Sequence, residues 1–392
     1  MNMIWGSPDK EGWPDAETAA AFSPETGNND MSENRQKQPN GKPRADGSEF
    51  DFGDLNEAGG GTAGPAAAEI EAKAREQERA ERTEAETSLR LMAEAQEAVL
   101  AALRETGRTP NPERLDALAA GEPVELKELK AEGVDAEAER RENANRVYLA
   151  KLKDADGREF TAVYKPKKGE AHYYEEQAAE SGQTGLRPER RHRKEWLGYQ
   201  LDTIFDVGSS PAATVREFQA PAGEPDAVGG YGAVVEYLNG RPALMTEGWR
   251  QKADAGELAR VADLHYLVGE TDGHDGQIII GDDRRLRAFD RGEAFLDSND
   301  FKFKSAAMEE ARDRGLNAHP DVLAAARRFL ASDRLQRAAA RAFEAAFGPE
   351  NGRRRYDLMF ARAKTYAAGG GIPYTELERT GRLQKIGDNR HE

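Results

Sequence analysis

The sequence predicts an α+β fold in which a β-rich region precedes a helical region and a polar extension precedes both. β-branched and aromatic residues alternate between short Gly and Asp turns from about 145 to 240. After 241, apolar residues recur at helical spacing in alanine-rich segments. The start is rich in Gly, Pro, Asn, Asp and Ser and has no sustained apolar period. We therefore expect a disordered tail, a helical extension, a main domain and a C-terminal tail at residues 1–65, 66–144, 145–368 and 369–392.

Composition limits the possible functions. The 392 residues carry a net charge of -16, which argues against a nucleic-acid partner, because a phosphate backbone is usually met by a basic face. The chain has no cysteine, so it contains neither a disulfide framework nor a cysteine-based zinc site. No apolar run approaches the roughly 20 residues of a membrane span, and no secretory signal is recognisable. We expect a cytoplasmic protein, with export by a non-classical signal in the N-terminal tail as the alternative.

The extension reads as helix. Residues 66–104 consist largely of Ala, Glu, Arg and Lys, and the second half adds a sparse apolar stripe at helical spacing. The stripe comprises Leu89, Met92, Val99 and Leu103. We expect it to pack on another element of this chain, with a helix that binds a partner protein as the alternative. Short helical pieces are expected at 112–121 and 125–143.

The β-rich region begins with a hairpin over 145–166, whose turn contains Asp156 and Gly157. A helix over 189–205 follows, then an edge strand over 210–218 and a buried strand within 229–240. The run Arg187 to Lys194 reads as an exposed basic helix start, with a role in gripping an acidic or phosphorylated group as the alternative.

The helical region opens with a helix over 257–269. The stretch TDGHDGQ then leads into the apolar strand QIIIG, and a tight turn connects it to a second strand, LRAFD. Alanine-rich helix is expected over 306–368. Polar groups crowded at the mouth of an apolar strand cost desolvation energy unless something binds them, and a metal-phosphate site is one candidate.

Phosphoryl transfer requires a lysine on the phosphates, a carboxylate that orients it, an acid that takes the acceptor's proton, and metal ligands. Each is present in the sequence. Alternation aims Lys165, at the end of its strand, to the same side as Val163, and Glu195 on the following helix could pair with it. Asp272 and Gln277 lie in the polar stretch, and Asp290 precedes a glycine that frees its loop to turn. Taken singly, each of these residues could equally be a surface or turn residue.

At these positions the sequence resembles atypical kinases of the phosphatidylinositol 3-/4-kinase-like and HipA-like kind. The similarity covers about 145–350 and comprises VYKPKKGE at 163–170, the pair Lys194-Glu195, TDGHDGQ, and FDRG at 289–292, in that order. It implies a two-lobed protein-kinase-like fold, with a small β-rich lobe to about 240 and a helical lobe over 241–368.

The resemblance also implies roles. Lys165 would hold the α and β phosphates of ATP, Glu195 would orient it, and Asp272 would be the catalytic aspartate. Gln277 and Asp290 would bind Mg²⁺, and adenine would lie against the backbone from Val234 to Leu238, comprising Val235, Glu236, Tyr237 and Leu238. The expected acceptor is a protein hydroxyl, on this chain or another.

Two positions depart from the family pattern. Gly273 stands where the family usually has arginine, which removes a charged anchor, and Gln277 stands where it has asparagine. Glutamine offers the same carbonyl on a longer arm, and Asp275 is a candidate to compensate. We expect His274 to be structural. The alternatives are a pseudokinase scaffold, a lipid or small-alcohol kinase, and an AMP transferase using the same cleft.

Overall fold

The computed structural model describes residues 65–108, 113–129, 147–167, 191–219, 229–298 and 301–384. Helix α2 (Pro65–Glu105) confirms the helix predicted over 66–104. Its first part, through Glu86, groups with a separate unit, whereas Thr87 onward belongs to the main unit. The tail predicted for 1–65 lies outside the described residues except for Pro65, and most of the helical piece predicted for 125–143 lies outside them too.

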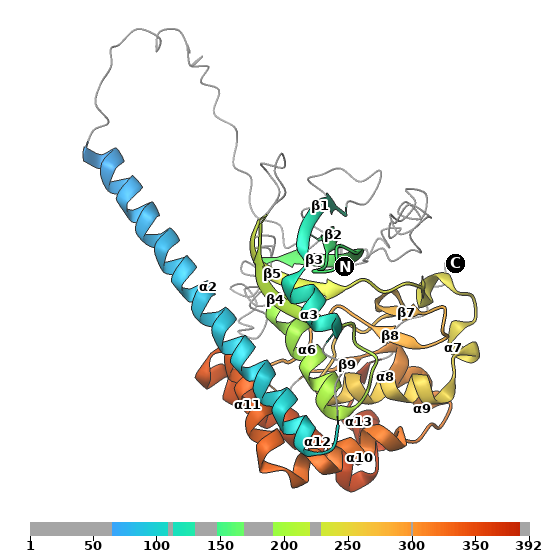
Figure 1. The fold of residues 1–392 in the computed structure, drawn as a ribbon. Helices are drawn as coiled ribbons and strands as arrows, with labels where there is room; N and C mark the ends of the chain where they lie inside the picture. Colours follow the sequence, from blue (N-terminus) through green and yellow to red (C-terminus); the bar gives the residue numbers. More distant parts are fainter. Residues whose placement is uncertain are drawn as a thin grey trace, which may run out of the picture. The chain divides into compact units, whose positions relative to one another are not determined.

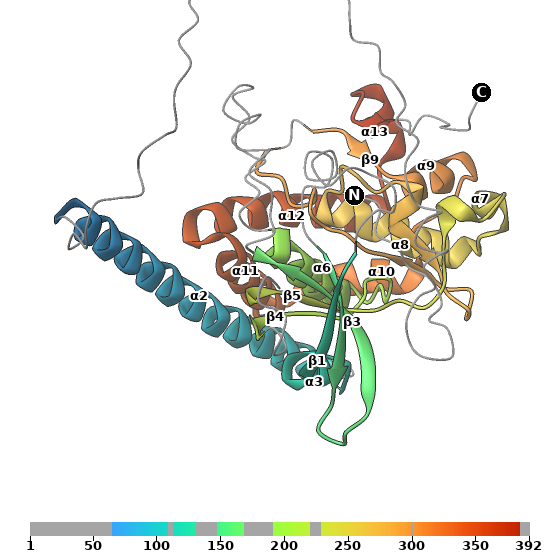
Figure 2. The same ribbon diagram turned by 90° about the horizontal axis from the view of Figure 1, so that it is seen from above.

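Five antiparallel strands form the main sheet, in the order β1-β2-β3-β5-β4. They are β1 (Glu122–Glu128), β2 (Tyr148–Lys153), β3 (Glu159–Pro166), β4 (Ala213–Phe218) and β5 (Gly230–Glu236). The predicted hairpin is confirmed as β2 and β3, and its turn is seen in Figure 2. The predicted edge strand is confirmed as β4, and the buried strand as β5.

One element was predicted wrongly. Residues 125–128, expected to be helical, belong to β1, which pairs along the edge of β2. Glu and Lys favour helices, but Leu126 alternates with charged neighbours and is 5% exposed on one face of the sheet. Burial against the sheet therefore outweighs intrinsic propensity, and the sheet starts before the boundary predicted at 145.

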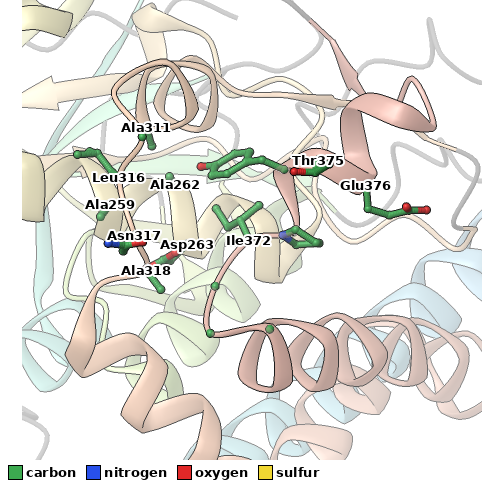
Figure 3. A pocket seen from close by; sticks show the side chains of 16 residues that line it. Ala259, Ala262, Asp263, Ala311, Leu316, Asn317, Ala318, Ile372, Thr375 and Glu376 are labelled. Atoms are coloured by element: carbon green, nitrogen blue, oxygen red, sulfur yellow. The ribbon is translucent and has the colours of Figure 1, made fainter.

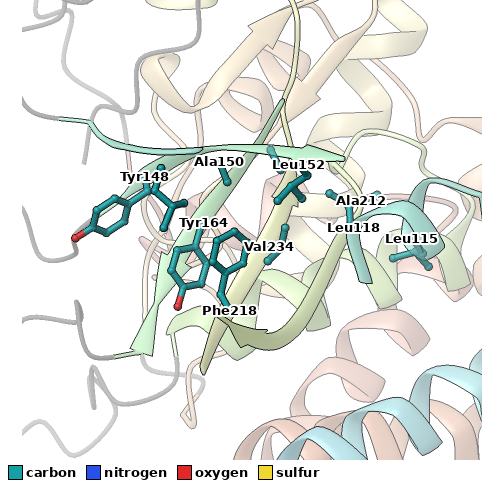
Figure 4. Close-up of a cluster of buried hydrophobic side chains, with 11 residues drawn as sticks. Leu115, Leu118, Tyr148, Ala150, Leu152, Tyr164, Ala212, Phe218 and Val234 are labelled. Atoms are coloured by element: carbon teal, nitrogen blue, oxygen red, sulfur yellow. The ribbon is translucent and has the colours of Figure 1, made fainter. Parts of the chain in front are cut away.

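Alternation along the strands gives the sheet two apolar faces. Helix α3 (Glu113–Ala120) covers one of them with Leu115 and Leu118, as Figure 4 shows. Tyr164 and Phe218 stack on that face with ring centroids 4.5 Å apart. The opposite face carries Val163, paired in register with Val235, and Lys165, paired with Ala233. Lys165 thus lies on the same side as Val163, as predicted.

Helix α6 (Arg191–Phe205) confirms the predicted helix and packs between the main sheet and the C-terminal helices (Figure 1). The second part of α2 lies against it: the indole N–H of Trp196 donates to Gln96 Oε1 at 3.2 Å. The predicted stripe is largely buried, with Met92, Val99 and Leu103 at most 2% exposed. The expectation that this stripe packs within the chain is confirmed.

The basic start of α6 is buried, contrary to the prediction of an exposed run, although 187–190 lie outside the described residues. Lys194 Nζ donates to the carbonyl of Gly292 at 2.6 Å, and Arg193 donates to that of Ala346 at 3.3 Å. Arg191 forms an ion pair with Glu293. These cations are accommodated in the interior because carbonyl and carboxylate oxygens accept their hydrogens.

Short elements connect the main sheet to the helices. A second antiparallel sheet has the order β6-β7-β8, formed by β6 (Arg241–Pro242), β7 (Ile278–Ile280) and β8 (Leu286–Ala288). Between β6 and β7 lie η3 (Ala243–Met245), α7 (Trp249–Lys252), α8 (Ala255–Val268) and η4 (Asp275–Gln277). Helix α8 confirms the helix predicted over 257–269, and β7 and β8 confirm the two predicted strands.

The C-terminal region is helical, as predicted. It contains α9 (Ala306–Asp313), α10 (Pro320–Ala331), α11 (Asp333–Phe347) and α12 (Pro349–Gly369). The predicted tail is structured as far as Gln384: α13 (Tyr374–Arg379) is followed by β10 (Leu383–Gln384), which pairs in parallel with β9 (Phe303–Lys304). Leu377 is 3% exposed. It anchors α13 although most of the neighbouring residues in the sequence are polar.

The structure therefore mixes helices and sheets, as the predicted α+β class requires: the two larger sheets are antiparallel, and β9 with β10 forms a parallel pair. None of the described helices combines the length and apolar character needed to cross a membrane.

Candidate functional site

A buried lysine bonded to two carboxylates forms the centre of the site. The ammonium of Lys165 pairs with Glu195 and also donates to Asp290 Oδ1 at 3.2 Å. The three residues are 6%, 5% and 7% exposed. Buried charges are energetically costly unless they are paired. The triad is therefore an organised interior ion-pair network and not a chance contact on the surface.

Three elements bring the triad together. Lys165 lies near the end of β3, Glu195 lies in the first turns of α6, and Asp290 lies in the loop after β8. Asp290 has φ 60°, in the left-handed region that Asp tolerates better than most residues. The next backbone N–H, of Arg291, donates to Glu195 Oε1 at 3.2 Å, which ties the loop to the helix.

Lys165 and Asp290 are charged, whereas burial outweighs the effect of Lys165 and raises the pKa of Glu195. Burial alone would lower the pKa of Lys165, but the carboxylates of Asp290 and Glu195 outweigh it and raise that pKa. Burial alone would raise the pKa of Asp290, yet Lys165 and Arg191 hold it well below its usual range. Asp290 is therefore an ionised buried carboxylate, as a hard cation requires of its ligand.

Asp272 and Gln277 form the neighbouring half of the site. Gln277 Nε2 donates to Asp272 Oδ2 at 3.3 Å, and the ammonium of Lys304 lies 3.2 Å from Asp272 Oδ1. The N–H of Phe289 donates to the carbonyl of Gln277 at 3.1 Å, because the pairing of β7 with β8 continues past both strands. The backbone of Gln277 is thereby bonded to the residue that precedes Asp290.

The donor set fits a magnesium ion. With Nε2 of Gln277 directed to Asp272, its Oε1 is buried and has no hydrogen-bond partner within the described part of the chain. Asp290 supplies the carboxylate. Mg²⁺ is commonly bound by one or two protein oxygens and completed by phosphate oxygens and water. Among the described residues, no group of three or more His, Asp or Glu side chains is arranged to hold a metal ion.

Two further residues hold the site together, and the sequence reasoning missed both. Glu270, fully buried, accepts from the N–H of Asp272 at 3.1 Å and pairs with Arg291 at 3.2 Å. Arg291 follows Asp290, so this ion pair ties the Asp272 loop to the Asp290 loop. The stem of Arg291 passes against α6 at Gly198, where an added Cβ would lie 2.8 Å from Arg291 Cγ. No local pattern in the sequence pairs these two residues, because they lie 21 positions apart.

Packing explains why glycine stands at position 273, which was interpreted from the sequence as the loss of a charged anchor. A Cβ at this position would lie 2.7 Å from Cε1 of the buried His265. No side chain fits there, so an arginine is excluded by packing. His274 caps η4, with Nδ1 accepting from the N–H of Gly276 at 3.0 Å, which agrees with a structural role. Asp275 is paired with Arg250 at 3.0 Å.

The segment expected to hold adenine covers the end of β5 and leads toward β6. Val235, Tyr237 and Leu238 pack in one apolar cluster with Ile279 and Phe289. Glu236 is different: its N–H donates to the carbonyl of Ala212 at 2.7 Å, and its side chain pairs with Arg114. The backbone N–H of Glu236 is therefore already engaged within the chain.

A separate cavity of about 450 Å³ lies between α8, the α9–α10 loop and the α12–α13 segment (Figure 3). Its walls include Ala262, Asp263 and Tyr374 and contain none of the predicted site residues. The N–H of His319 donates to Asp263 at 2.8 Å. Burial raises the pKa of Asp263 to about 7.

The sequence matches no protein-family model and no curated protein. Among solved structures, the fold is similar to the one titled "Crystal structure of the golgi casein kinase", with a TM-score of 0.39 and 13% sequence identity. The match covers 65% of this chain and 72% of that chain. A structural similarity at this level does not indicate an activity.

Proposed function

We propose that the protein is an ATP- and Mg²⁺-dependent phosphotransferase with a two-lobed, kinase-like arrangement that phosphorylates a protein hydroxyl. One observation carries the proposal. Lys165 is bonded to both Glu195 and Asp290, Gln277 is bonded to Asp272, and the carbonyl of Gln277 accepts from the N–H of Phe289, the residue before Asp290. These contacts support the proposal, because phosphoryl transfer requires a lysine, an orienting carboxylate, a metal ligand and a proton acceptor near one another.

Each residue has a distinct role in the proposed reaction. Lys165, oriented by Glu195, exchanges its bond to Asp290 for phosphate oxygens of the nucleotide. Asp290 and the Oε1 atom of Gln277 would hold Mg²⁺, which supplies charge neutralisation of the phosphates when bound. Asp272 is placed to accept the proton of the acceptor hydroxyl, since Gln277 and Lys304 fix both of its carboxylate oxygens.

Labelled nucleotide tests the proposal. The purified protein is incubated with Mg²⁺ and γ-labelled ATP, alone and with a mixture of protein substrates, beside Asp290→Asn. We expect label on protein that depends on Mg²⁺ and disappears in the variant. Label from α-labelled ATP would instead identify an AMP transferase. Nucleotide binding with no transfer would identify a scaffold, and no nucleotide binding would refute the proposal.

A further inference from the structure

Lys304 approaches the proposed catalytic aspartate from an element that no motif identified. Its Nζ lies 3.2 Å from Asp272 Oδ1, with the side chains of Lys304 and Asp272 37% and 27% exposed. The triad around Lys165 is buried, whereas this pair is open to solvent. An acceptor molecule and the terminal phosphate can therefore reach Lys304.

The backbone of Lys304 is fixed on two sides. Its carbonyl accepts from the N–H of Gly273 at 2.7 Å, and the carbonyl of Gly273 accepts from Ala306 at 2.8 Å. On the other side, β9 pairs with β10, and the N–H of Phe303 donates to the carbonyl of Arg382 at 2.7 Å. Lys304 is thus attached to the residue that follows Asp272, and groups held on rigid elements are positioned most precisely.

The loop from Asp272 to Gln277 lacks a cation of its own. His274, the one basic side chain in this loop, accepts from the N–H of Gly276 at Nδ1 and caps η4. Arg250, nearby, is occupied by Asp275 at 3.0 Å and Glu309 at 3.1 Å. Negative charge spreads over the oxygens of a transferring phosphoryl group, and preorganised cations at that point accelerate the reaction.

We propose that Lys304 is a catalytic residue that binds the transferred phosphoryl group beside Asp272, an inference that rests on the proposed phosphotransfer. The acceptor oxygen forms a bond to the γ phosphorus as the bond from that phosphorus to the β,γ-bridging oxygen breaks. The electron pair leaves with ADP, and the acceptor's proton passes to Asp272. Lys304 neutralises the non-bridging oxygens and stays protonated throughout.

The neighbouring Lys302 provides a matched control, because it is exposed and two residues away in the same FKFK stretch. For Lys304→Met we expect kcat to fall by about 10²–10³-fold, with KM for ATP changed by less than about 3-fold, since the contact forms only in the transition state. Lys302→Met should behave as wild type. Lys304→Arg should recover part of the activity, because it restores the positive charge.

Binding gives a readout apart from turnover. Calorimetry measures the affinity for Mg²⁺ and ADP with and without aluminium fluoride, a planar mimic of the transferring phosphoryl group. We expect aluminium fluoride to tighten ADP binding in wild type and in Lys302→Met, but not in Lys304→Met, which should bind ADP alone normally.

Equal kcat in Lys304→Met and Lys302→Met, while wild type is active and Asp290→Asn is not, would overturn the role of Lys304 alone. A rise in KM without a fall in kcat would also overturn it. Absence of both transfer and nucleotide binding in wild type would overturn the proposed function itself.

Discussion

The N–H of Phe289 donates to the carbonyl of Gln277 at 3.1 Å, so the residue before Asp290 is bonded to the last residue of the polar stretch TDGHDGQ. This single backbone bond extends the β7–β8 ladder and brings together two segments that the sequence separates by a turn. The strand pair therefore connects the polar stretch, in which Gln277 is bonded to Asp272, to the loop that begins at Asp290.

Asp290→Asn is expected to lower phosphotransfer by on the order of 10³-fold, because an amide cannot supply the charge that the metal and phosphates need. The matched control is Asp282→Asn, an exposed aspartate in the β7–β8 turn. Transfer to protein is measured at saturating Mg²⁺ with γ-labelled ATP. Equal activity in the two variants would remove Asp290 from the mechanism.

Lys165→Met is expected to reduce the free energy of unfolding by about 3–5 kcal/mol, because Glu195 and Asp290 would remain buried without their cation. Adding Glu195→Gln should restore part of the loss, since the two side chains are coupled. Urea denaturation measures both, with Lys153→Met, on an exposed end of β2, as control. Additive losses in the double variant would contradict a direct pair.

Gly273→Ala is expected to destabilise the fold by about 1–3 kcal/mol, because a Cβ 2.7 Å from His265 forces a shift in a packed region. Phosphotransfer should fall as well, because Gly273 links Asp272 to Lys304. Gly369→Ala is the control, since a Cβ there meets nothing within 4 Å. Similar melting temperatures for the two variants would show that the loop is not tightly packed.

Asp263 is expected to make stability depend on pH. Burial raises its pKa from the model-peptide value of 3.8 to about 7, so the folded state binds more protons than the unfolded state between these values. The free energy of unfolding therefore falls as pH rises from about 4 to 7. Asp263→Asn removes this contribution, and wild type should lose stability relative to the variant across that window. Thermal unfolding of wild type and variant at several pH values measures this change in stability. A difference in stability between the two proteins that stays constant from pH 4 to 7 would show that Asp263 is ionised throughout that range.

Local sequence signals predicted most elements. Alternation identified β2, β3 and β5, and helical spacing identified α6 and α8, because each of these elements shows a regular apolar face along its own length. Alternation also placed Lys165 on the correct side of its strand, and the order of short polar motifs pointed to Glu195, Asp272, Gln277 and Asp290. Their roles in phosphotransfer stay predictions.

Local sequence signals failed where the structure of an element depends on partners that are distant in sequence. Strand β1 and the pair of β9 with β10 form because another strand offers hydrogen-bonding groups and a buried face, which no local propensity reveals. The buried start of α6 was misread for the same reason: carbonyls of Gly292 and Ala346 accept hydrogens from Lys194 and Arg193.

By itself, then, the sequence determined the class of fold and the residue types of the site, since periodicity and polar motifs are local properties. Tertiary structure alone decided that Glu270 and Arg291 link the two loops, that Gly273 leaves space for His265, and that Lys304 reaches Asp272. Each of these contacts joins residues of different segments, so no periodicity within one element reveals it, and burial stabilises the first two.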